Sequence, residues 1–170
     1  MIDYKNLTAD MRRRMHEAVR MINDEAPAFV AVAWEKMKDA NFAAQGFVVK
    51  GSARPMWQPR KKETPATTGK RILHSTGILQ SSVHFTPGKG LVRGWVDLGK
   101  VPYAQVHNEG GTITQNVRPF SRQTRYGPQQ VRGFSRKLTY PKRQYLGYSP
   151  DIFKAAEKDI KSRLDKIFKR

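Results

Sequence analysis

The positions of the helix-breaking residues place the strongest constraint on what this chain can fold into. Apolar side chains recur at helical spacing near both ends of the 170-residue sequence, whereas glycine and proline repeatedly interrupt residues 47–148. Short strand-like runs lie between these breakers. The pattern predicts an α+β fold in one domain, residues 1–170, with helices at both ends and a small, mainly antiparallel sheet between them.

The first 46 residues predict one bent helix or a pair of helices. Thr8 is a suitable N-cap for the first helix. Pro27 interrupts the pattern, because proline inside a helix costs about 3 kcal/mol, and the pattern then resumes until Gly46. The apolar face of the first helix is predicted to contain Leu7, Met11, Met15, Ala18 and Ile22.

Residues 149–170 predict an amphipathic C-terminal helix that packs on the sheet. Ser149 is a suitable N-cap, Pro150 fits the first turn, and Asp151 complements the helix dipole there. The predicted apolar face consists of Phe153, Ala156, Ile160, Leu164 and Ile167.

The middle of the chain, residues 47–148, predicts short strands and turns. Residues 82–85 and 91–98 are expected to form a hairpin whose five-residue loop is 86–90. A short helix is expected to begin at Pro102 and to stop at Gly110. Two further short strands, 112–114 and 138–140, are expected to pair with each other.

Positive charge is concentrated in this middle region. The net charge is +18, and residues 40–150 contain 18 basic residues against three acids. Residues 115–137 have no acid and are rich in Arg, Gln, Gly, Pro and Ser, which predicts a long, mobile basic loop. Basic residues interleaved with aromatics are typical of a sequence-tolerant nucleic-acid binder, and equally of a solvated loop that docks on an acidic neighbouring subunit. The candidate contact residues are Arg118, Arg122, Arg125, Arg132, Arg136 and Lys137.

The residue inventory argues against an enzyme. The absence of cysteine excludes disulfides and thiolate sites, and the four histidines lack metal-ligand spacing. His107-Asn108-Glu109 suggests a nuclease-like site only weakly, because three acids in residues 40–150 are too few for most hydrolytic or two-metal sites. We therefore expect no catalytic residue, no metal ligand and no cofactor.

No stretch approaches the roughly 20 apolar residues of a membrane span, and the first residues lack the apolar run of a signal peptide. We expect a soluble protein that is made in the cytoplasm and has no membrane partner.

Five blocks of sequence occur in an order that resembles the phage virion morphogenesis family, the tail-completion proteins of Mu-like and related phages. The block from Tyr103 to Gly111 is the most specific of them. Gln144 and Tyr145 depart from the family pattern, which usually has proline and phenylalanine at these positions. The blocks are WQPRK at 57–61, RIL at 71–73, TGILQSS at 76–82, PYAQVHNEGG at 102–111 and RQYLGYS at 143–149.

The resemblance implies a non-enzymatic structural protein at the head–tail junction of a virion. It implies a homo-oligomeric ring of unknown order that contacts other neck, connector or tail proteins, and genomic DNA in the channel is a further candidate partner. The residues that carry the family motifs are expected to be structural. They are Trp57, Leu73, Gly77, Leu79, Tyr103, Ala104, His107, Gly110, Gly111, Arg143, Leu146 and Gly147.

Three classes of protein remain open from the sequence. The first is a structural neck or tail-completion subunit, and the second is a free nucleic-acid-binding protein that acts through its basic loop. The third is a nuclease. Support for this class would require metal-dependent cleavage of nucleic acid that His107→Ala abolishes.

Overall fold

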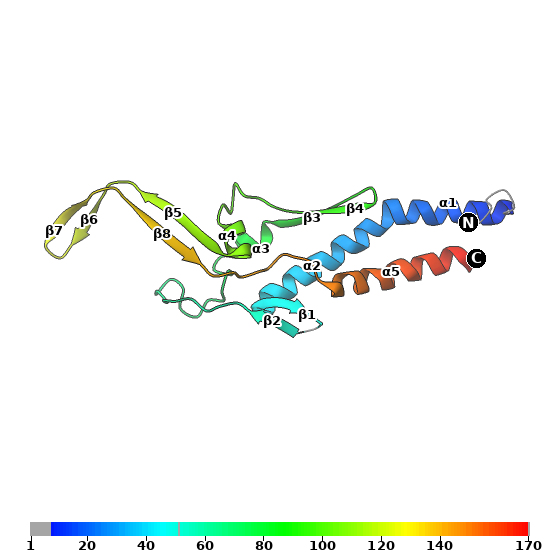
Figure 1. Cartoon of the computed structure of the whole chain (residues 1–170), viewed down its shortest axis with the longest axis horizontal. Coiled ribbons are helices and arrows are strands. Elements are labelled where there is room, and N and C mark those ends of the chain that lie inside the picture. The colour runs from blue at the N-terminus through cyan, green and yellow to red at the C-terminus, as the bar shows by residue number, and fades with distance from the viewer. Residues whose placement is uncertain (1–7, 51, 170) are drawn as a thin grey trace.

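The computed structural model describes residues 8–50 and 52–169. Figure 1 shows an elongated molecule, with long helices at one end and a slender pair of strands at the other. Helices and antiparallel strands occupy separate parts of the chain, which confirms the predicted α+β class. Leu7 and Arg170 lie outside the described residues.

The N-terminal helix is nearly continuous, but it changes its hydrogen-bonding pattern just before Pro27. Helix α1 spans Ala9–Arg20, a π-helical turn η2 spans Met21–Glu25, and α2 spans Ala26–Ala44. The wider turn suits this place, because proline lacks an N–H and its ring crowds the carbonyl four residues earlier. The predicted interruption at Pro27 therefore takes the form of a π-helical turn, with Pro27 in the first turn of α2.

The predicted caps of the helices are confirmed. Thr8 Oγ1 accepts a hydrogen bond from the Met11 N–H at 3.2 Å, and Ser149 Oγ accepts one from the Asp151 N–H at 3.3 Å. Helix α2 ends one residue before Gln45, which adopts a left-handed conformation with φ 55°. The C-terminal helix α5 spans Pro150–Phe168.

The strands of the described residues form four separate two-stranded antiparallel pairs. Two short helices, α3 (Ile78–Ser81) and α4 (Ala104–Glu109), lie between these pairs in sequence. Helix α4 begins two residues after the predicted start at Pro102 and stops at Gly110 as expected. The pairs are β1 (Gly46–Val49) with β2 (Ser52–Met56), β3 (Val83–Gly88) with β4 (Leu91–Val96), β5 (Gly111–Val117) with β8 (Phe134–Tyr140), and β6 (Phe120–Thr124) with β7 (Gly127–Val131).

The predicted loop over residues 86–90 is wrong in its length. Strand β3 continues to Gly88, which pairs with Leu91 at the start of β4. The hairpin therefore turns over two residues, Lys89 and Gly90, and Gly90 supplies the positive φ of 67° that such a tight turn needs.

The predicted mobile loop over residues 115–137 is also wrong, because most of these residues belong to strands. The expected pairing of 112–114 with 138–140 is correct, and Ile113 lies opposite Leu138. Pairing continues to Val117 and Phe134, and β6 and β7 then form a second hairpin beyond a break. The alternation that identifies a strand from sequence is weak here, because Gln115 and Arg136 interrupt the apolar face of β5 and β8.

The core is divided into a central cluster and two smaller ones along the helices. The central cluster joins α2, α3, α4 and the segment after β8, and Tyr145, with 1% of its surface exposed, lies within it. Helix α5 packs along α1 and α2 and against Phe47 of β1. Its buried face includes Ile152, which is 2% exposed, whereas Phe153, predicted to be buried, is 49% exposed. The central cluster consists of Phe42, Trp57, Leu79, Val83, Val101, Ala104 and Tyr145.

Candidate interaction site

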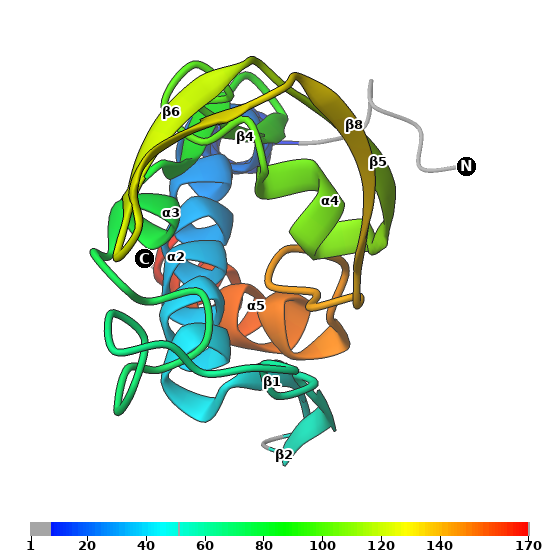
Figure 2. The same ribbon diagram turned by 90° about the vertical axis from the view of Figure 1, so that its left-hand side faces the viewer.

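Residues 111–140, from the start of β5 to the end of β8, form an arm that extends away from the helices. Figures 1 and 2 together show that the arm curves along its length and that β6 and β7 lie at its far end. None of the three buried clusters of the described chain includes a residue of the arm. The arm therefore depends on its own hydrogen bonds and on its attachment at α4.

The inner arm is the part formed by β5 and β8, and its two faces differ in polarity. The register of β5 and β8 places Ile113 beside Leu138 and Val117 beside Phe134 on one face. Thr112 pairs with Thr139 on the other face, where their hydroxyl oxygens are 3.0 Å apart. Because a strand alternates its side chains between faces, the arm has one largely apolar face and one polar face.

A bend separates the inner arm from the outer hairpin, which is formed by β6 and β7. The strand pairing stops at Val117 and Phe134 and resumes at Phe120. Pro119 cannot donate a ladder hydrogen bond, and a Cβ on Gly133 would lie 3.1 Å from Pro119 Cδ. These two residues pack closely at the bend, although in the sequence they are typical of a loop.

The six candidate contact cations of the arm are dispersed along it, and none forms an ion pair with a described residue. Arg122 is held to Gln129 across the outer hairpin by bonds of 3.0 and 2.7 Å. Arg136 of β8 donates to the Gln115 side chain of β5 at 2.9 Å across the inner arm. Arg118 and Arg132 flank the bend, Arg125 is at the tip, and Lys137 is on the polar face.

The base of the arm is fixed by Gly110 and Gly111, which link α4 to β5. Gly110 has φ 77°, and a Cβ there would lie 2.9 Å from the Lys142 nitrogen. Gly111 has φ 132° with open space around its Cα. The Arg143 N–H donates to the His107 carbonyl at 2.7 Å, which joins the chain leaving the arm to α4.

Arg143 fastens the tryptophan-containing loop to the segment after the arm. Its guanidinium is buried and donates to the carbonyls of Gln58 at 3.0 Å and Pro59 at 3.3 Å. The Trp57 indole N–H donates in the opposite direction, to the Gln144 carbonyl at 2.8 Å. Burial lowers the pKa of Arg143, with a smaller contribution from Arg60.

The remaining motif residues lie in or beside the central cluster. Leu79 and Ala104 are buried in it, and Leu73 and Leu146 pack against it. Gly77 is the N-cap residue of α3 and has a positive φ of 76°. A Cβ on Gly147 would collide with the side chain of Gln144.

Two asparagines that the sequence reasoning missed connect these segments. Asn41, with none of its surface exposed, donates to the Tyr145 carbonyl at 3.0 Å and accepts from the Val48 N–H at 2.7 Å. Asn108 Oδ1 accepts from the N–H groups of Tyr145 and Leu146, at 3.1 and 3.0 Å. The sequence does contain one signal for Asn41, since its polar amide stands among the regularly spaced apolar residues of α2.

His107 lies between aromatic rings and not in a cluster of acids. The ring centres of Tyr103 and Tyr140 lie 5.7 and 5.1 Å from its own. Burial, and then the charge of Arg143, lower the pKa of His107 to about 4. Asn108 is occupied by backbone bonds and Glu109 bonds to Gln105, so the three residues of the nuclease-like motif do not converge.

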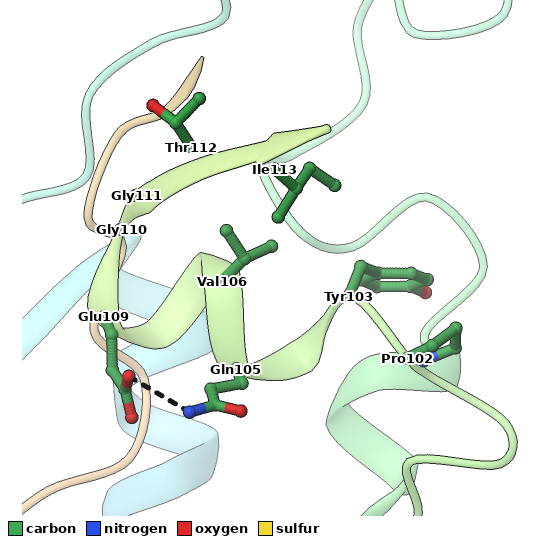
Figure 3. Close-up of a pocket in the computed structure, with 9 residues that line it drawn as sticks. All are labelled: Pro102, Tyr103, Gln105, Val106, Glu109, Gly110, Gly111, Thr112 and Ile113. Atoms are coloured by element: carbon green, nitrogen blue, oxygen red, sulfur yellow. Dashed lines mark hydrogen bonds between the residues drawn. The ribbon is translucent and has the colours of Figure 1, made fainter. Parts of the chain in front are cut away.

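An open groove lies at the base of the arm, between α4 and β5. Its volume is about 480 Å³, and Tyr103, Val106 and Ile113 supply its apolar walls. Figure 3 shows these side chains around the hollow, with Glu109 and Gln105 joined by a hydrogen bond at its edge. The Gln105 amide donates to Glu109 at 3.3 Å.

Within residues 8–50 and 52–169, no three His, Cys, Asp or Glu side chains are grouped so that they could hold a metal ion. In the same part of the chain, no helix is long and apolar enough to cross a bilayer. The candidate site is thus an exposed arm with a groove at its base, a geometry that fits the binding of another macromolecule.

Comparison with known proteins identifies a family. The model of the phage virion morphogenesis family matches residues 8–168, almost the whole chain. Neither the curated proteins nor the solved structures gave a significant match.

Proposed function

The chain belongs to the phage virion morphogenesis family, and from that premise we propose that it is a tail-completion subunit at the head–tail junction. A structural role in building the bacteriophage virion follows from the family itself. The family match over residues 8–168 carries the proposal, since it covers the helices, the arm and the groove together. In this role the protein acts by binding and not by catalysis.

A subunit of this kind works as a homo-oligomeric ring, and the exposed apolar surface supports that arrangement. Large apolar side chains are exposed at several places in the described chain, among them Val32 at 53%, Leu91 at 57% and Tyr148 at 70%. Exposed apolar side chains that lie together mark sites of association in soluble proteins, and the exposed rings of Tyr148 and Phe153 form such a pair, with their centres 5.4 Å apart. Rings close through head-to-tail contacts between unlike surfaces, and the body and the arm are two such surfaces.

The proposed partners are copies of this chain and the neighbouring neck, connector or tail proteins. The proposed location is the neck region of the virion, after assembly in the host cytoplasm. In this arrangement the arm reaches beyond its own subunit, toward channel DNA or an acidic partner ring.

The test is a nonsense mutation in this gene, in the phage that carries it, with complementation by the wild-type chain. Electron microscopy is expected to show separate heads and tails without complementation and joined virions with it. Mass spectrometry of purified virions should detect the chain. Particles that join and infect equally well without the protein would contradict the proposed function.

Nucleic-acid binding through the arm is the second candidate function. The six basic residues of the arm favour it, because residues 110–150 contain no acidic residue that could offset their charge. Neutralising Arg118, Arg122 and Arg132 with glutamine should weaken binding to a short DNA duplex regardless of sequence. It should also reduce the salt slope of log affinity by up to roughly 3, about 0.9 for each phosphate that is no longer neutralised. Fluorescence anisotropy measures both, and Lys61→Gln with Lys62→Gln is the control outside the arm. Equal slopes for the arm variant and the wild type would exclude DNA as the partner of the arm.

A further inference from the structure

The tip of the arm presents a tyrosine and an arginine as one unit. The outer hairpin turns between Thr124 and Gly127, so Arg125 and Tyr126 occupy the turn itself. The Arg125 guanidinium lies over the Tyr126 ring, 4.5 Å from its centre, and also donates to its hydroxyl. Tyr126 is 82% exposed, the highest value among the large apolar and aromatic side chains described. Such an exposed aromatic–arginine pair has the composition of an interface anchor.

The groove at the base of the arm has the complementary composition. Its walls include Tyr103 and Ile113, which are 42% and 40% exposed, and it holds Glu109 at its edge (Figure 3). Glu109 is the only acid between Asp97 and Asp151. The volume of about 480 Å³ falls within the roughly 300–1,000 Å³ of pockets that hold small ligands, so it accepts a phenol ring.

We infer that the tip of one subunit inserts into the groove of a second copy of this chain. Tyr126 then packs between Tyr103 and Ile113, and Arg125 pairs with Glu109. This contact rests on the ring proposed above and assigns residues to its interface.

The contact has to join two molecules. Tip and groove lie at opposite ends of the arm, and the strands from Gly111 to Thr124 span roughly 40 Å at about 3.3 Å per residue. Strand pairing keeps the arm extended on each side of its bend, and the outer hairpin lies at the far end of the arm (Figure 1), so the tip does not reach the groove of its own chain. A tip that binds the groove of the next copy leaves a free tip and a free groove. Repetition of this contact builds a ring or a filament.

Charge also favours this groove over other surfaces of a second copy. Residues 40–150 carry fifteen more basic residues than acidic ones, so most of the middle region repels another arm. Glu109 is exposed and bonded to Gln105 in the described structure, and forms no ion pair with a described basic residue. Its carboxylate is therefore available to an arginine from outside.

Charge reversal tests the contact in the full-length chain, with self-association followed by sedimentation velocity. Arg125→Glu and Glu109→Arg are each expected to weaken association about tenfold or more, as when one partner of a close charge pair is reversed. The double variant restores the pair and should return association to near the wild-type level. Arg132→Glu and Glu63→Arg make the same charge changes outside the contact and should not weaken it. Single reversals without effect, or a double variant no better than the single ones, would overturn the contact.

Engineered cysteines give a second measurement, which the absence of native cysteine makes clean. A chain with both Ile113→Cys and Tyr126→Cys should form an oxidised ladder of linked subunits, in purified protein or in assembled particles, because the proposed contact places these two side chains together. Either change alone should give dimers at most. No ladder in either preparation would overturn the contact.

The two proposals fail in different ways. Virions that need the protein for joining but tolerate Arg125→Glu alone and Glu109→Arg alone would disprove the tip–groove contact and leave the proposed function standing. Virions that join without the protein would disprove the proposed function whatever the association assay shows.

Discussion

Replacing Asn41 with alanine is expected to destabilise the protein strongly, because this side chain satisfies two backbone groups inside the core. Its amide donates to the Tyr145 carbonyl at 3.0 Å, and its carbonyl accepts from the Val48 N–H at 2.7 Å. Alanine leaves the buried Tyr145 carbonyl and the partly buried Val48 N–H without this partner, and each unpaired group costs up to about 1–3 kcal/mol. The free energy of unfolding should therefore fall by roughly 2–6 kcal/mol. The midpoint of thermal unfolding should fall by on the order of 10 °C, at about 2–4 °C per kcal/mol for a chain of this length.

Urea unfolding followed by tryptophan fluorescence measures this destabilisation, because the Trp57 ring lies 5.4 Å from Phe42 in the same cluster. Asn116→Ala is the matched control. Asn116 is exposed on the arm, and among the described residues its side chain bonds only to the Ser135 hydroxyl, which donates to it; its removal should therefore change stability by no more than about 0.5 kcal/mol. A change for Asn41→Ala as small as that for Asn116→Ala would refute the reasoning.

Two further predictions concern the base of the arm. Since burial lowers the pKa of His107 from 6.5 to about 4, the unfolded chain binds the proton more tightly than the folded one. Stability should then fall by on the order of 1–2 kcal/mol, allowing for solvent screening, as the pH drops through this range. Thermal unfolding from pH 7 to pH 4 measures this slope, and His107→Gln should reduce it; an unchanged slope would show that another group titrates. Gly110→Ala should cost about 2–4 kcal/mol through its positive φ and its clash with Lys142, whereas Gly69→Ala, with φ 72° and open space, should cost about 1–2 kcal/mol. Equal destabilisation of the two variants in urea unfolding would remove the role of the close approach to Lys142.

The helical parts of the fold could be predicted because their signals are local. A cap such as Ser149 and a proline in the next position act within one turn of the chain, so the sequence alone identifies the start of α5. Which face of that helix is buried depends on distant segments. The exposure of Phe153 and the burial of Ile152 follow from contacts with α2 and β1, which no local pattern specifies.

The arm shows where sequence reasoning stopped. Gln115 and Arg136 interrupt the apolar face of the inner strands, and Pro119 and Gly133 at the bend are residue types that are typical of a loop. Its positive charge follows directly from the residue composition. The groove and the buried contacts of Asn41 were not predicted, because they join residues that are far apart in sequence and carry no motif of their own.

The position of the arm outside the core has a consequence for which substitutions the fold tolerates. Its residues contribute nothing to the buried clusters found in the described chain, so substitutions there do not compete with the requirements of the core. Substitutions at the tip are therefore expected to carry little risk to folding, whatever they do to the proposed contact with a second copy. In the proposed role, folding would depend on the buried contacts of the body, and binding would depend on an arm that lies outside them.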